Sequence, residues 1–293
     1  MEGGVVIDVI VPACLALMMV GLGMTLVVDD FRRVLVYPKA GTVGLAFQMI
    51  LLPAVGFGLA TLFPLMPKIA VGIMLIACCP GGVASNVITH LAKGDTALAV
   101  TLTVISSSLA IITIPIIVNL SLVHFVGPHS TVELPLLETV LKVFALTIPT
   151  IVTGMVLKAK TPRFAERSRK IVDIGGLLFL IVIIIAVAVK EKDLIVNESF
   201  KVGPVTLALC LSTMLLGYFG AKLFKINHER SIAIAIATGF QNSALALVIA
   251  TSFMEDATIA IPPAVYTVVM WLAAFAVVAV RNLRMRKTGG TED

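Results

Sequence analysis

Long apolar runs separated by short charged connections dominate the sequence. Nine of the runs are close to 20 residues or longer, which is the length that a helix needs to cross the hydrocarbon core of a bilayer. The runs are continuous and do not alternate apolar with polar residues, so the pattern argues against a membrane β-barrel. We therefore predict an all-α membrane protein with nine transmembrane helices. The expected helices cover residues 5–28, 40–62, 69–91, 96–123, 134–157, 171–189, 202–224, 231–253 and 258–280.

Two of these runs, the third and the eighth, are interrupted by glycine and then by polar side chains. They read Pro80-Gly81-Gly82-Val83-Ala84-Ser85-Asn86 and Thr238-Gly239-Phe240-Gln241-Asn242. Glycine and proline often serve only packing in membrane helices. However, an unpaired polar group in hydrocarbon costs several kcal/mol. Two matched interruptions, each followed by amide side chains, therefore indicate a functional site.

The interruptions occupy corresponding places in two sets of four runs. If residues 5–123 form one repeat and residues 171–280 another, each interruption lies in the third member of its repeat. The run at 134–157 then connects the repeats and places them in opposite orientations. Inverted repeats with paired discontinuous helices are a known plan of transporters. We expect one transmembrane domain over residues 1–293, with 281–293 as a tail.

Basic residues gather on one side of the predicted membrane. The first, third, fifth and seventh connections and the tail hold most of the 22 Lys and Arg residues. Cytoplasmic connections are rich in these residues, so we expect a multi-pass plasma-membrane protein with its N-terminus outside and its C-terminus in the cytoplasm. The same distribution accounts for the net charge of +5. We expect a lipid bilayer and no nucleic acid as partners, and a monomer.

The composition excludes a water-soluble protein. Hydrophobic residues make up 59% of the chain and charged residues 13%, whereas a soluble domain carries about 25% charged residues. An intramembrane enzyme is not expected, because the sequence has no His-Glu-x-x-His motif, no paired aspartates inside a run and no serine–histidine pair.

Interrupted helices present free backbone groups inside the bilayer. The carbonyl end of the first half attracts cations, and the N–H end of the second half attracts anions. No Lys or Arg lies deep within a run, so we expect helix ends and amides to bind an anionic substrate. The expected substrate-binding residues are Ser85, Asn86, Gln241, Asn242 and, near the outer end of run 96–123, Asn119.

The residues around both interruptions resemble the bile acid:sodium symporter family. The resemblance rests on Cys78-Cys79-Pro80-Gly81-Gly82-Val83-Ala84-Ser85-Asn86, Leu91-Ala92-Lys93-Gly94-Asp95 and Ala237-Thr238-Gly239-Phe240-Gln241-Asn242-Ser243. It extends over nearly the whole chain. It implies a panel domain and a core domain in which the two discontinuous helices cross. It also implies secondary active transport of an organic anion, bile-acid-like or a small carboxylate, by alternating access and sodium symport.

The resemblance further implies which residues would bind sodium. The matching positions are Gln48, Ser85, Asn86, Thr103, Thr238, Phe240 and Gln241. The chain departs from the family at two positions, because Ala237 stands at a glutamate and Ala99 at a serine. An anionic ligand compensates for removing a cation from water, so its loss is expected to weaken sodium binding.

Two questions about sodium therefore stay open at this point. Transport is either sodium symport through impaired sites or sodium-independent, proton-coupled or facilitated transport on the same fold. Ala237 is either a natural loss or an engineered change that traps one conformation.

Overall fold

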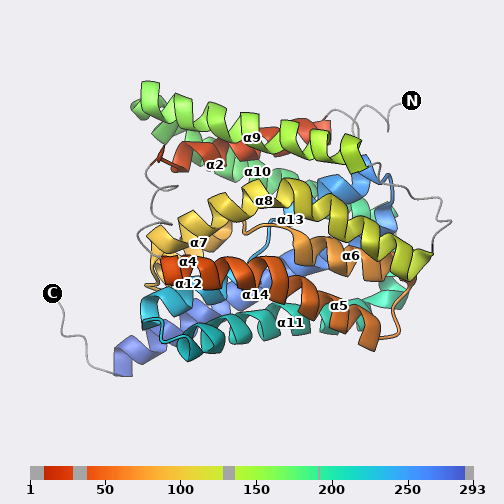
Figure 1. Ribbon diagram of the computed structural model, residues 1–293. Coiled ribbons are helices and arrows are strands. Elements are labelled where there is room, and N and C mark those ends of the chain that lie inside the picture. Colours follow the sequence, from red (N-terminus) through yellow and green to blue (C-terminus); the bar gives the residue numbers. More distant parts are fainter. Residues whose placement is uncertain (1–9, 29–37, 128–135, 191, 288–293) are drawn as a thin grey trace.

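A computed structural model describes residues 10–28, 38–127, 136–190 and 192–287, and in these residues it is helical with no strand (Figure 1). The elements are α2 (Val11–Thr25), α4 (Pro38–Ala46), η2 (Phe47–Leu51), α5 (Leu52–Leu62), α6 (Pro67–Cys78), α7 (Val83–Leu91), α8 (Thr96–Ser121), η3 (Leu122–Val126), α9 (Leu136–Lys160), α10 (Pro162–Lys190), α11 (Lys192–Leu223), α12 (His228–Gly239), α13 (Ser243–Val248), η4 (Ile249–Phe253) and α14 (Ala257–Lys287). The all-α class is thus confirmed.

Five helices in the described part of the chain are long and apolar enough to cross a membrane, so the membrane character is confirmed. They are Pro38–Leu62, Thr96–Val126, Leu137–Lys160, Phe200–Leu223 and Ala257–Ala279. Shorter apolar helices account for the other expected spans, at Val11–Thr25, Pro67–Cys78, Ile174–Ile185 and Ser243–Phe253. Two are short because the interruptions divide the runs at 69–91 and 231–253, and residues 5–9 of the first run lie outside the described residues. The count of nine stays a prediction.

Two expected connections between spans are helical. α10 begins at Pro162, well before the expected start at residue 171, and α11 begins at Lys192 instead of residue 202. Pro162 suits the first turn of a helix, where its missing N–H leaves no bond unmade. Charged residues in these segments are compatible with helices that continue beyond the hydrocarbon into the polar region of the bilayer.

The helices form two groups. α2, α9 and α10 pack on one another along one side of the molecule and are called the panel; the other helices form the core (Figure 1). Gly23 of α2 faces Gly154 of α9, and a Cβ on either would overlap a backbone carbonyl of the opposite helix. Small residues permit this close approach, which is how membrane helices associate where lipid is as apolar as the side chains.

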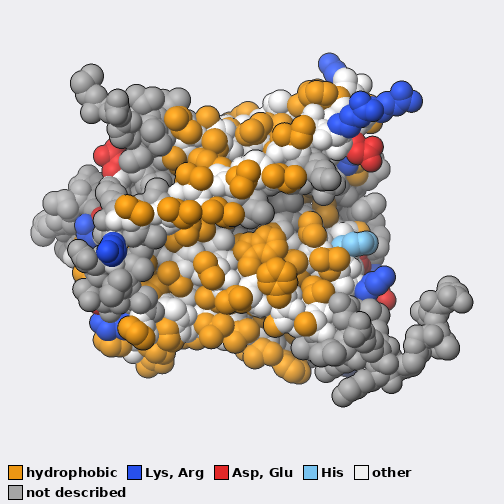
Figure 2. Space-filling model, turned by 180° about the vertical axis from the view of Figure 1, so that it is seen from behind, with side chains coloured by type: hydrophobic (Ala, Val, Ile, Leu, Met, Phe, Trp, Pro, Cys, Tyr) orange, Lys and Arg blue, Asp and Glu red, His pale blue; other side chains and the backbone are white. Residues whose placement is uncertain are grey.

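The surface is apolar between two charged ends. Figure 2 shows hydrophobic side chains across the middle of one face and charged side chains at its two ends. Exposed Leu, Ile, Val and Phe side chains occur in panel and core helices alike. This distribution suits a bilayer that surrounds the middle of the molecule.

An ion pair joins α8 to α12 at one end of the core. Asp95 precedes α8, and its Oδ1 accepts a hydrogen bond from the Leu98 backbone N–H at 3.0 Å. Its Oδ2 lies 3.3 Å from Nε of Arg230, in the first turn of α12. One carboxylate thus caps one helix and binds the beginning of another.

A second ion pair repeats this arrangement at the beginning of α6 and α14. Asp256 precedes α14, and its Oδ1 accepts from the Thr258 N–H at 2.9 Å. Its Oδ2 lies 2.7 Å from Nζ of Lys68, in the first turn of α6. Each pair therefore ties the first half of an interrupted helix to the start of the last helix of the other four-helix set.

Both aspartates are expected to matter more than an ordinary surface ion pair. Asp95→Ala and Asp256→Ala each remove a cap and a partly buried pair, so each should lower the free energy of unfolding by about 1–3 kcal/mol. Glu138→Ala is the control, because Glu138 pairs with Lys142 one turn away on an exposed surface. Thermal unfolding in detergent measures all three variants. An equal shift for all three would show that the caps contribute nothing.

Candidate functional site

The two interruptions meet each other in the core. Gly81 and Gln241 form an antiparallel backbone bridge. The Gly82 N–H donates to the Phe240 carbonyl at 3.1 Å, and the Asn242 N–H donates to the Pro80 carbonyl at 2.8 Å. Backbone groups released by breaking two helices thus satisfy one another, as the low-dielectric interior requires. The two predicted interruptions thus lie side by side.

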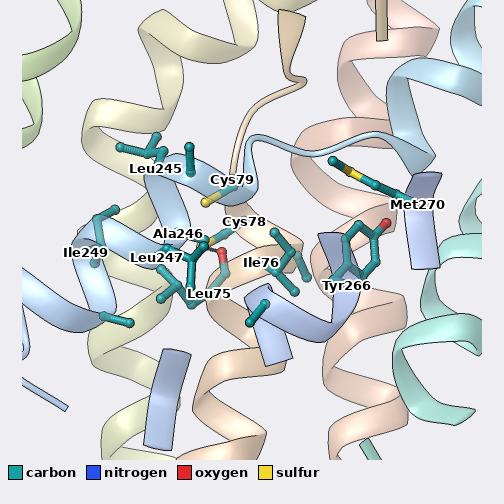
Figure 3. Packing of buried hydrophobic residues seen from close by; sticks show 14 of the residues in the cluster. Leu75, Ile76, Cys78, Cys79, Leu245, Ala246, Leu247, Ile249, Tyr266 and Met270 are labelled. Atoms are coloured by element: carbon teal, nitrogen blue, oxygen red, sulfur yellow. Dashed lines mark hydrogen bonds between the residues drawn. The ribbon is translucent and has the colours of Figure 1, made fainter. Parts of the chain in front are cut away.

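Apolar packing holds the crossover in place. Figure 3 shows side chains at the end of α6, including Cys78 and Cys79, against those of α13 and η4. Tyr266 and Met270 of α14 lie on the other side of these segments (Figure 3). Tyr266 is fully buried, and its hydroxyl donates to the Gly239 carbonyl at 2.9 Å. The last carbonyl of α12 therefore has a partner from another helix.

Polar side chains converge on Gly81. A Cβ built on Gly81 would lie 3.1 Å from Nε2 of Gln48, 3.5 Å from Oγ1 of Thr103 and 3.7 Å from Oγ of Ser85. The Thr103 hydroxyl also lies 3.2 Å from Oδ1 of Asn86 and 2.9 Å from its own helix at the Ala99 carbonyl. All four polar residues are buried. The structure thus brings together Gln48, Ser85, Asn86 and Thr103.

Gln48 reaches the second interruption because its helix is locally widened. It lies in η2, a π-helical turn directly before α5, which has Pro53 in its first turn. Proline cannot donate to the carbonyl one turn back, and such π turns often present functional side chains. Nε2 of Gln48 donates to the Ala237 carbonyl at 2.8 Å.

Protein donors bind the carbonyls at the end of α12. Besides Gln48, Nε2 of Gln241 lies 3.2 Å from the Ala237 carbonyl and 2.8 Å from the Thr238 carbonyl. The Gly239 and Phe240 carbonyls accept from Tyr266 and Gly82. The end of the half-helix that attracts cations is therefore supplied with amide, hydroxyl and backbone hydrogens.

The fit to sodium is partial. Oε1 of Gln48 and Oε1 of Gln241 are buried and have no hydrogen-bond partner among the described residues, and neutral oxygens of this kind suit a hard cation. However, Ala99 and Ala237 are fully buried in one apolar cluster. Within the described ranges, no three His, Cys, Asp or Glu side chains group together. The site offers oxygens without the charge that offsets cation desolvation.

A cavity of about 330 Å³ lies beside the crossover, between panel and core. The core contributes Gly82, Ala84, Val87, Gln241, Asn242, Ser243, Ala244, Met270 and Trp271. The panel contributes Met18, Met19, Val172, Ile174, Gly176 and Leu180. Pockets of roughly 300–1,000 Å³ with a few polar groups in an apolar wall are typical small-molecule sites. This one is at the small end of that range.

The expected substrate residues divide into two groups. Gln241 and Asn242 line the cavity, whereas Ser85 and Asn86 are buried beside Thr103 and are not among its lining residues. Asn119 lies near the end of α8, about 24 Å along the axis from Thr103. The cavity gives no support for Asn119, whose role stays a prediction.

Several lining residues carry no signal in the sequence. Met18, Met19 and Met270 are ordinary apolar residues of membrane helices. Trp271 stands out in the sequence only as the single tryptophan. Tyr266 is similarly identified only by its contact with Gly239. Which of these residues line the cavity depends on the direction in which each side chain packs, and the sequence does not give that direction.

Comparison with known proteins identifies the family. The profile of the Sodium Bile acid symporter family matches residues 12–198. The chain belongs to this family. Like its relatives, it is a membrane transporter and not an enzyme.

Curated relatives of the symporter family agree. The chain is 33% identical over 256 residues to an uncharacterized sodium-dependent transporter, YocS, of Bacillus subtilis (strain 168), covering 87% of this chain and 77% of that protein. It is 33% identical to a probable chloroplastic sodium/metabolite cotransporter, BASS1, of Arabidopsis thaliana, with 87% and 62% covered. It is 28% identical to the ileal sodium/bile acid cotransporter of Oryctolagus cuniculus, with 87% and 73% covered.

Gly81 should be intolerant of a methyl group in this transporter. In Gly81→Ala the new Cβ would lie 3.1 Å from Nε2 of Gln48, so the amide must shift by a few tenths of an ångström and its hydrogen bond to the Ala237 carbonyl weakens, at a cost of about 1 kcal/mol. In the control Gly58→Ala the new methyl meets open space, and a helical alanine is favourable. Thermal unfolding should show a loss of stability for Gly81→Ala only. Equal stability of the two variants would mean that the polar cluster does not surround Gly81 tightly.

Proposed function

We propose that the chain is a secondary active transporter of a small or amphipathic organic anion, working by alternating access. Support comes from one observation above the others. α7 begins at the crossover without a side-chain cap among the described residues, and Gly82 and Ala84 at its start line the cavity. Uncapped N–H groups at a helix start favour an anion.

The second interruption contributes polarity of a different kind. Oδ1 of Asn242 caps α13 by accepting from the Leu245 N–H at 3.1 Å, so this helix start is already satisfied. Gln241, Asn242 and Ser243 nevertheless line the cavity, and its described lining contains no Lys or Arg. The anionic group would therefore be bound by backbone N–H groups and neutral side chains. Without an ion pair, the substrate can leave more easily when the site opens to the other side.

Alternating access by two inverted repeats is part of the proposal. The matched ion pairs Asp95–Arg230 and Asp256–Lys68 support it, since each has the same roles at corresponding helix starts. The cavity lies against the start of α7 and the middle of α10, where residues between 172 and 180 line it.

Sodium coupling is proposed to be weakened, with the seven family positions as its remaining ligands. The oxygens of Gln48 and Gln241 support residual binding, whereas the donors on the Ala237 and Thr238 carbonyls and the apolar surroundings of Ala99 support the weakening. A sodium ion carried with the substrate would have to replace the glutamine hydrogens at these carbonyls.

Uptake into proteoliposomes tests the proposed function. We expect saturable uptake of a radiolabelled carboxylate, reduced by Gln241→Ala, with a modest increase when sodium replaces choline outside. Strict sodium dependence would refute the weakened coupling. Uptake indifferent to sodium would favour the sodium-independent alternative, and flux without saturation would indicate a channel.

Ala237→Glu should make the protein depend on sodium. A carboxylate in this apolar cluster costs several kcal/mol unless it is paired, so the variant should unfold at lower temperature in choline and be rescued by sodium. Adding Ala99→Ser should strengthen the rescue.

Ala233→Glu provides the matched control. Ala233 is fully buried in the same cluster, one turn earlier in α12. This variant should lose stability in both salts, because its carboxylate lies one helical turn from the carbonyl that the Gln48 and Gln241 amides contact. Rescue of both variants by sodium, or of neither, would show that the sodium positions have been placed wrongly.

A further inference from the structure

The two walls of the cavity differ in chemistry. Every polar side chain among its described lining residues belongs to the core, namely Gln241, Asn242 and Ser243. The panel wall consists of Met18, Met19, Val172, Ile174, Gly176 and Leu180. A ligand bound there meets hydrogen-bonding groups on one side and only apolar side chains on the other.

Met18 of α2 is seated against Gly176 of α10. A Cβ built on Gly176 would lie 2.8 Å from Cγ, 3.3 Å from Sδ and 3.2 Å from Cε of Met18. The Met18 side chain therefore occupies the space that the missing Cβ leaves. The neighbouring Gly175 has nothing within 4 Å of its built Cβ, so the contact is specific to one of two adjacent glycines.

Met18 is also the less buried of the two methionines in the panel wall, since Met19 is 2% exposed. Methionine is unbranched and adapts to irregular spaces at little cost. On the opposite wall, Sδ of Met270 lies 3.9 Å from the Ser243 hydroxyl, and Trp271 has a large ring. In a cavity this small, a change in the rotamer of Met18 changes the space available to a ligand.

We propose that Met18, seated on Gly176, sets the length of the apolar chain that this transporter accepts behind a carboxylate. The inference rests on the proposed function, since it assigns the carboxylate to the crossover side and the apolar chain to the panel side. Met18→Ala opens the wall, so longer chains fit. Gly176→Ala pushes Met18 into the cavity, so shorter chains are preferred.

The single tryptophan provides the measurement. Trp271 lines the cavity, so its fluorescence reports binding of hexanoate, octanoate, decanoate and dodecanoate to the protein in lipid nanodiscs. Burying a methylene contributes about 0.8 kcal/mol. Room for two more should therefore shift the ratio of dodecanoate to octanoate affinity about tenfold in Met18→Ala. Gly176→Ala should shift it in the opposite direction.

Matched variants control for stability and for partition into lipid. Met24→Ala removes the same atoms from a buried position of α2 that is not among the lining residues, and Gly175→Ala adds the same methyl in open space. Both should keep the wild-type chain-length profile. Since Met18→Ala and Gly176→Ala act in opposite directions, either variant alone tests the proposal if the other does not fold.

Two failures are distinguishable. If the carboxylates bind to the wild type but the profile is unchanged in both Met18→Ala and Gly176→Ala, the role of Met18 is refuted. If no carboxylate changes Trp271 fluorescence, or alkylammonium ions of equal length bind as well, the proposed anion site itself is refuted.

Discussion

Backbone hydrogen bonding at the crossover is the constraint on which the other features depend. Two helices stop in the middle of the protein, and hydrocarbon provides no water to satisfy the exposed groups. Gly82 and Phe240 on one side, and Pro80 and Asn242 on the other, pair instead. The pairing brings the two segments into contact, and the side chains of Gln48, Thr103 and Ser85 surround Gly81 beside it. The polar cluster and the cavity both lie against this contact.

Carbonyl groups at the end of α12 show how the protein uses that contact. Gln48 comes from a helix distant in sequence, and Gln241 from the interruption itself, yet both donate to Ala237. Two amide N–H groups thus occupy the carbonyl end of α12, which would otherwise attract a cation. A buried carboxylate nearby would need a cation at all times, whereas the amide hydrogens bind these carbonyls without one, although Oε1 of Gln48 and Oε1 of Gln241 have no hydrogen-bond partner among the described residues. Ala237 and the internal donors to its carbonyl are consistent parts of one arrangement.

Polar residues made the core of the site predictable from sequence. Ser85, Asn86 and Gln241 are conspicuous at the interruptions, because each polar group in hydrocarbon must find a partner, whereas Gln48 and Thr103 were expected from the family resemblance. The structure brings all five to the crossover. The cavity wall could not be predicted, because Met18 or Leu180 resembles any other apolar residue until its direction is known.

Helix limits were predictable only where glycine interrupts a helix. The interruptions at Gly81 and Gly239 were found, but α10 and α11 extend through charged segments that were expected to be connections. Charge marks the edge of the hydrocarbon and does not stop a helix. Asn119 was chosen for its polarity alone, and it is not among the described residues that line the cavity.

The crossover has a consequence for how the chain is made. Pro80 and Gly82 enter the membrane about 160 residues before Phe240 and Asn242 are synthesised, which at typical translation rates takes roughly 10–30 s. Throughout that interval the first interruption has no partner from the second. Water or the insertion machinery must solvate it until the C-terminal half is inserted. Biogenesis of this protein therefore depends on keeping the unpaired backbone of the first interruption away from lipid.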